Sequence, residues 1–91
     1  MLIFFMDINQ LINEVKKKIE NNIKVIELEI LDKSFLHKKH KNFNRHKFHI
    51  KIKIKSDELN KLSKIEATRK LHSILENEIK NNIHSLEILF I

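Results

Sequence analysis

A strict alternation of apolar and polar residues over positions 47–55 constrains the fold more than any other feature of this sequence. The apolar positions of this alternation are Phe48, Ile50, Ile52 and Ile54. A period of two places successive side chains on opposite faces of a β-strand, whereas the helical period is about 3.6. We therefore expect a strand with one buried face, and an opposite face that carries lysines and His49.

Two other segments have the spacing of amphipathic helices. In the first, Asp7 is a suitable N-cap, and apolar residues recur at helical spacing up to Ile19. Asn21 and Asn22 suit the end of this helix. The second helix starts at the capping-box pattern Ser63-Lys64-Ile65-Glu66 and continues to about Lys80. Its apolar stripe consists of Ile65, Leu71, Ile74, Leu75 and Ile79.

Two shorter alternations complete the pattern. Ile26, Leu28 and Ile30 alternate with glutamates, and Leu86, Ile88 and Phe90 alternate in a last strand that starts near Ile83. The order is helix, strand, strand, helix, strand (α-β-β-α-β), so we expect one α+β domain over residues 1–91. Both helices would cover one face of a three-stranded mixed sheet. The first two strands would pair antiparallel, and the last would run parallel to one of them.

The composition excludes several classes of site. The chain has no cysteine, which rules out disulfides, a nucleophilic thiol and a metal site that is ligated by cysteines of this chain alone. It has no glycine either, so the glycine loops that cradle phosphates cannot form. No serine–histidine–acid or paired-carboxylate arrangement stands out, and we expect that the protein is not an enzyme.

The apolar residues 1–6 form a short N-terminal extension that is too short to span a bilayer or to serve as a secretory signal. We therefore expect a cytoplasmic protein with no membrane association. Met6 is an alternative start of translation.

Three histidines are candidate metal ligands. His37 and His40 lie in a polar stretch from about Asp32 to Arg45, which is longer than most connections between strands. His84 lies at the start of the last strand. If that strand runs parallel to the second one, both strands start at the end of the sheet where the long stretch lies, and the three histidines converge. The sequence permits this arrangement without requiring it. For His46, His49 and His72 we expect structural or surface roles.

The row of lysines on the polar face of the second strand has two interpretations. It could bind phosphate groups of a nucleic acid, and the candidates are Lys51, Lys53, Lys55 and Arg69. It could equally be a solvated sheet face on which the lysines pair with Glu27 and Glu29 of the neighbouring strand. We favour the second interpretation, because no aromatic residue stands between the lysines to stack on a base.

Three local signatures resemble the BolA family over about residues 7–89. They are the segment Asp32-Lys33-Ser34-Phe35-Leu36-His37-Lys38-Lys39-His40, the strand Phe48-His49-Ile50-Lys51-Ile52 and the segment Ile83-His84-Ser85-Leu86. The expected order of elements agrees with the family fold, a variant of the KH-like arrangement. Two departures are Leu59-Asn60-Lys61 in place of the family's Phe-x-Gly, and Ala67-Thr68-Arg69 in place of its Arg-His-Arg.

This resemblance implies an adaptor of the histidine type that binds a monothiol glutaredoxin and shares a [2Fe-2S] cluster with it. The glutaredoxin cysteine and a glutathione thiol would supply the sulfur ligands, and this chain would supply His84 with either His37 or His40. Such a protein would act in iron–sulfur cluster trafficking or in iron and redox regulation. The alternative is a DNA-binding transcriptional regulator of KH-like fold, although the glycine loop with which KH domains clamp a nucleic-acid backbone cannot form here.

Overall fold

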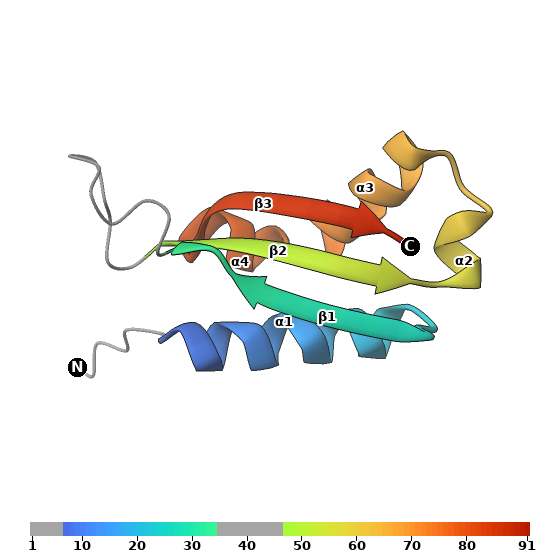
Figure 1. Ribbon diagram of the computed structural model, residues 1–91. Coiled ribbons are helices and arrows are strands. Elements are labelled where there is room, and N and C mark those ends of the chain that lie inside the picture. The colour runs from blue at the N-terminus through green and yellow to red at the C-terminus, as the bar shows by residue number, and fades with distance from the viewer. Residues whose placement is uncertain (1–6, 35–46) are drawn as a thin grey trace.

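The computed structural model describes residues 7–34 and 47–91 (Figure 1). Its elements are α1 (Ile8–Asn22), β1 (Glu27–Asp32), β2 (Phe48–Lys55), α2 (Asp57–Asn60), α3 (Lys64–Ile74), α4 (Glu76–Asn81) and β3 (Ile83–Phe90). The predicted order is confirmed, with two differences in the helices. The short helix α2 was not predicted, and the expected second helix is divided into α3 and α4. The apolar extension expected at residues 1–6 lies outside the described residues.

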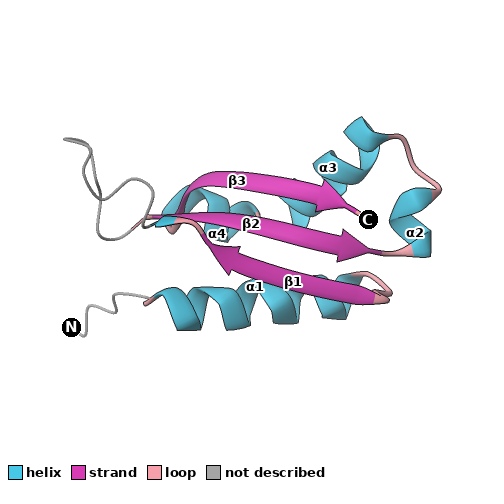
Figure 2. Ribbon diagram, in the orientation of Figure 1, coloured by secondary structure: helices cyan, strands magenta, loops and turns pink. Residues whose placement is uncertain are grey.

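The three strands form one mixed sheet in the order β1-β2-β3 (Figure 2). β1 pairs antiparallel with β2, and β3 pairs parallel with β2. β2 and β3 therefore start at the same end of the sheet, which is the arrangement that the histidine prediction required. The helices pack against one face of the sheet, and the polar side chains of β2 lie on the other face.

The core lies between the helices and the sheet. Its fully buried residues come mainly from every fourth position of α1, from alternate positions of β2 and from α3: Leu11, Val15, Ile19, Ile50, Ile52, Ile54, Ala67 and Leu71. Two residues assigned to apolar stripes are in fact exposed: Ile65 at 64% and Ile26 at 55%. Ala67 and Leu71 define the buried side of α3, so Ile65 faces away from it. Ile26 precedes β1 at the end of the sheet.

The ends of the helices follow the predicted capping chemistry. The Ser63 Oγ accepts a hydrogen bond from the Glu66 N–H at 3.1 Å and donates one to Glu66 Oε1 at 2.9 Å. Asp7 forms a capping box with Gln10 at the start of α1. The boundary between α3 and α4 is at Leu75 (φ −100°, ψ 18°), where neither glycine nor proline marks a break. None of the helices in the described parts of the chain is long and apolar enough to cross a bilayer.

Candidate functional site

A β-bulge at the start of β3 determines the orientation of His84. Phe48 is paired with Ile83, but the next residue of β2, His49, is paired with Ser85, so His84 is an extra residue in the register. A bulge of this kind changes the face to which the following side chains point. Ile83 is only 4% exposed and Leu86 packs against the core, whereas His84 is exposed. In a regular strand without a bulge, His84 would lie on the same face as Leu86 and point towards the helices.

The bulge brings His84 against His49 on the open face of the sheet. The centroids of the two imidazole rings are 5.0 Å apart, and the ring planes are inclined by 57°. His49 Nδ1 lies 2.6 Å from the Ser85 Oγ, which is hydrogen-bond distance. His49 is 9% exposed, so it is a buried member of the polar face. The prediction that His49 has only a structural or surface role did not include this contact with His84.

His49 also connects β2 to the end of β1. Its backbone N–H donates to the Ser34 Oγ at 3.0 Å, and its carbonyl accepts from the Lys33 N–H at 2.7 Å. Ser34 is 6% exposed, and its own N–H donates to Asp32 Oδ1 at 2.9 Å in an Asx-type turn. These bonds join Lys33 and Ser34 to the start of β2, opposite the bulge in β3.

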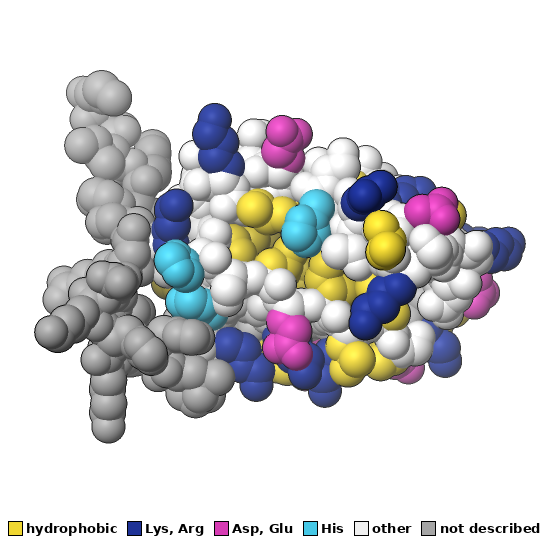
Figure 3. All heavy atoms as spheres, turned by 90° about the horizontal axis from the view of Figure 1, so that it is seen from above, with side chains coloured by type: hydrophobic (Ala, Val, Ile, Leu, Met, Phe, Trp, Pro, Cys, Tyr) yellow, Lys and Arg dark blue, Asp and Glu magenta, His cyan; other side chains and the backbone are white. Residues whose placement is uncertain are grey.

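The predicted metal ligands divide into one that the structure describes and two that it does not. His84 lies at the end of the sheet where the described chain stops at Ser34 and resumes at Lys47 (Figure 1). His37 and His40 lie outside the described residues, as does His46, so their convergence with His84 stays a prediction. Figure 3 shows histidine side chains together at one end of the molecule. His72 is an exposed residue of α3.

At this end of the sheet, the described residues expose the imidazole of His84. No group of three or more histidine, cysteine, aspartate or glutamate residues that could hold a metal ion occurs within residues 7–34 and 47–91. His84 offers an exposed imidazole, which binds metals in its neutral form. It could supply one nitrogen ligand to a metal centre.

The lysine row is largely matched by acidic residues of the neighbouring strands. Lys51 Nζ lies 3.5 Å from Glu87 Oε1 of β3. In the register of β1 and β2, Lys53 is opposite Glu29 and Lys55 is opposite Glu27. Cross-strand pairs of opposite charge stabilise a sheet modestly. Arg69 is exposed on α3, in the layer that covers the other face, so the structure does not bring it together with the three lysines.

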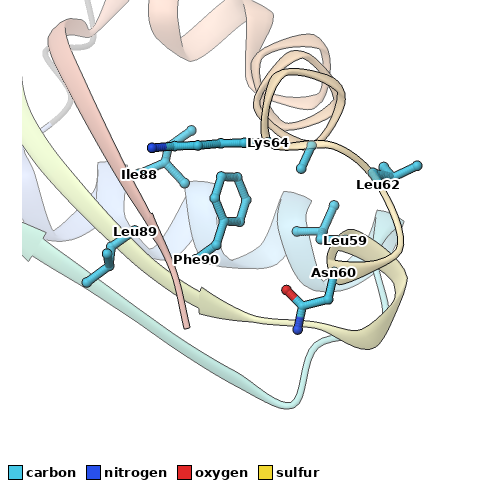
Figure 4. A pocket seen from close by; sticks show the side chains of 8 residues that line it. Leu59, Asn60, Leu62, Lys64, Ile88, Leu89 and Phe90 are labelled. Carbon is cyan, nitrogen blue, oxygen red and sulfur yellow. The ribbon is translucent and has the colours of Figure 1, made fainter.

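A cavity of about 280 Å³ lies between the α2–α3 connection and the end of β3, which is the opposite end of that strand from His84 (Figure 4). Its lining is largely apolar, with Leu59, Ile88 and Phe90 pointing into it and Lys64 extending across it (Figure 4). A single lysine beside apolar side chains provides no acid–base pair.

Comparisons with known proteins converge on one family. The family model for BolA-like proteins matches residues 19–90. A BolA-like protein from Dictyostelium discoideum is 38% identical over 77 residues, which cover 84% of this chain and 65% of that relative. The chain thus spans just under two thirds of the relative's length.

Solved structures give the same result for the fold. The BolA domain of SufE1 from Arabidopsis thaliana is similar with a TM-score of 0.74 and 27% identity, over 86% of each chain. BolA1 from Arabidopsis thaliana is similar with a TM-score of 0.73 and 23% identity, again over 86% of each chain. Both have the α+β arrangement with a three-stranded mixed sheet that the sequence predicts.

Proposed function

The chain belongs to the BolA-like protein family, and from this premise we propose that it is a non-enzymatic adaptor that binds a monothiol glutaredoxin and co-ligates a shared [2Fe-2S] cluster. Its role would be in iron–sulfur cluster trafficking or in iron and redox regulation. The observation that carries the proposal is the bulge, which turns His84 out of the core and exposes its imidazole at the end of the sheet.

The chemistry of His84 suits this role. A neutral imidazole binds iron near neutral pH without the deprotonation that a thiol requires. A cluster held partly by histidine has a higher reduction potential than one held by cysteines alone, as in Rieske centres. The chain contains no cysteine, so the sulfur ligands must come from the glutaredoxin and from glutathione. His84 would hold the cluster on the side of this protein.

A second ligand is proposed from the segment between Ser34 and Lys47. Both of these residues lie at the end of the sheet where His84 is exposed (Figure 1). A segment that leaves and returns at this end carries His37 and His40, and either could complete the pair with His84. Separate His37→Ala and His40→Ala variants discriminate between them, because only one should weaken cluster binding as strongly as His84→Ala.

Anaerobic reconstitution tests the proposal. The protein is mixed with a monothiol glutaredoxin, glutathione, iron and sulfide, and the visible absorption and circular dichroism spectra are recorded. We expect a spectrum distinct from that of the glutaredoxin alone, and its loss in His84→Ala. His72→Ala is the matched control, since it removes another exposed histidine from a helix. A spectrum that is identical with and without this protein, together with no complex in gel filtration, would refute the proposal.

DNA binding is the alternative that the charge of +6 leaves open. The pairing of Lys51 with Glu87, and of the other strand lysines with glutamates across β1, gives it less support. Binding through phosphate contacts alone would weaken steeply with salt. A sequence-selective complex that survives physiological salt, and is lost on removing Lys53 and Lys55, would favour the alternative.

A further inference from the structure

We infer that His49 is a positioning residue, which holds the His84 imidazole in one orientation on the open face of the sheet; this inference rests on the proposed function. The bulge alone only exposes His84. An exposed side chain samples several rotamers, and fixing one of them costs conformational entropy. A neighbouring group must therefore restrict His84 if it is to present a ligand atom in a defined direction.

The His49 ring is the group that contacts His84. The two rings lie 5.0 Å apart at the centroids and are tilted by 57°. This separation and inclination are typical of rings in contact. The contact exists because the bulge places His84 and Ser85 opposite the single residue His49. The same irregularity thus exposes His84 and supplies the surface against which its ring rests.

His49 is itself held by three hydrogen bonds, two to the end of β1 and one to β3. Its N–H donates to the buried Ser34 Oγ, and its carbonyl accepts from Lys33. Its ring Nδ1 is hydrogen-bonded to the Ser85 Oγ at 2.6 Å. The backbone is thus fixed by the end of β1, and the ring is fixed by β3. A side chain restrained in this way can restrict the rotamers of the His84 ring beside it.

The location of His49 argues against a role in core packing alone. The apolar core lies on the helix-covered face, to which Phe48 and Ile50 belong. His49 is on the opposite face, yet it is only 9% exposed. Its backbone N–H contacts Ser34, and its ring contacts His84 and Ser85. A preorganised ligand binds more tightly than a mobile one, and groups that orient metal-binding histidines typically change affinity by about 10–100-fold.

Nuclear magnetic resonance of the protein without any metal tests the orientation directly. We expect the side-chain couplings of His84 to show one dominant χ1 rotamer in the wild type, and averaging over rotamers in His49→Leu. His49→Phe keeps a ring beside His84 but loses the hydrogen bond to Ser85, so it should give averaging that is partial and weaker than in His49→Leu. Ser85→Ala, which removes one exposed hydroxyl, should give partial averaging. Equal averaging of His84 in the wild type and in His49→Leu would overturn the inference.

The shared cluster provides the second readout. With glutaredoxin and glutathione, we expect His49→Leu to weaken cluster sharing about tenfold. His49→Phe keeps the ring but loses the bond to Ser85, so we expect it to weaken sharing about threefold. We expect Ser85→Ala to weaken it about threefold, as the loss of one hydrogen bond implies. Wild-type sharing in His49→Leu would overturn the inference and leave the proposed function intact. A third outcome separates the two ideas. If the wild type shares no cluster, yet His84 has one rotamer in the wild type and several in His49→Leu, the proposed function is refuted and the positioning role is supported.

Discussion

A buried ion pair between α1 and α4 gives the sharpest quantitative prediction. Lys18 Nζ lies 2.6 Å from Glu78 Oε2, and the two side chains are 32% and 4% exposed, respectively. Glu78 Oε1 is buried and has no hydrogen-bond partner within residues 7–34 and 47–91. The carboxylate therefore depends on Lys18 for most of its stabilisation, whereas the ammonium group of Lys18 retains access to water.

This asymmetry sets the magnitudes. Lys18→Met leaves a charge buried without a partner, which we expect to lower the free energy of unfolding by about 3 kcal/mol. Glu78→Leu leaves a lysine that can extend its head group into solvent, at a cost of about 1 kcal/mol. The double variant replaces the pair with apolar groups and should lie within about 1 kcal/mol of the wild type. The coupling free energy is then about 3–5 kcal/mol in magnitude.

Urea denaturation of the four proteins, followed by circular dichroism, measures this cycle. In a separate thermal melt, Lys18→Met should lower the melting temperature by about 12–24 °C, given a shift of about 4–8 °C per kcal/mol for a domain of this size. Lys70→Met is the matched control, because it breaks the exposed Lys70–Glu58 pair at 2.9 Å and should cost about 0.5 kcal/mol or less. If Lys18→Met cost no more than this control, or no more than Glu78→Leu, the reasoning from burial would be refuted.

Three further substitutions test the core, the site and a helix cap by the same denaturation assay. Ile52→Ala removes a fully buried side chain from the middle of β2 and should cost about 3 kcal/mol; a cost under 1 kcal/mol would contradict the core assignment. Ser34→Ala leaves the buried His49 N–H without its acceptor and should cost about 1–2 kcal/mol; hydrogen exchange at that amide should quicken. Ser63→Ala removes the N-cap of α3 and should cost about 1 kcal/mol, whereas Ser63→Asp should cost little.

The periodicity of the sequence was sufficient to predict the strands and the layers. The alternation in β2 depends only on which residues are apolar. A shift of one residue in the register would turn all of its apolar side chains out of the core, so the buried face is well determined. The parallel pairing of β2 with β3 was permitted but not required, because it depends on how the helices between them pack. The exposed position of Ile65 was missed for a similar reason: the spacing of α3 identifies an apolar stripe but does not say which side meets the sheet.

The candidate site was predicted less completely than the fold, although one signal for it is present in the sequence. The core residues of β3 are Ile83, Leu86, Ile88 and Phe90, so a spacing of three precedes the regular spacing of two. One extra residue at the start of a strand is what a bulge requires, and this spacing could have indicated that His84 and Ser85 both leave the core. The contact with His49 then follows from the register, because a two-for-one pairing needs a single residue opposite. The bulge, a local departure from the strand pattern, is thus the feature that exposes the proposed ligand His84. Such departures from regular structure are expected at functional sites.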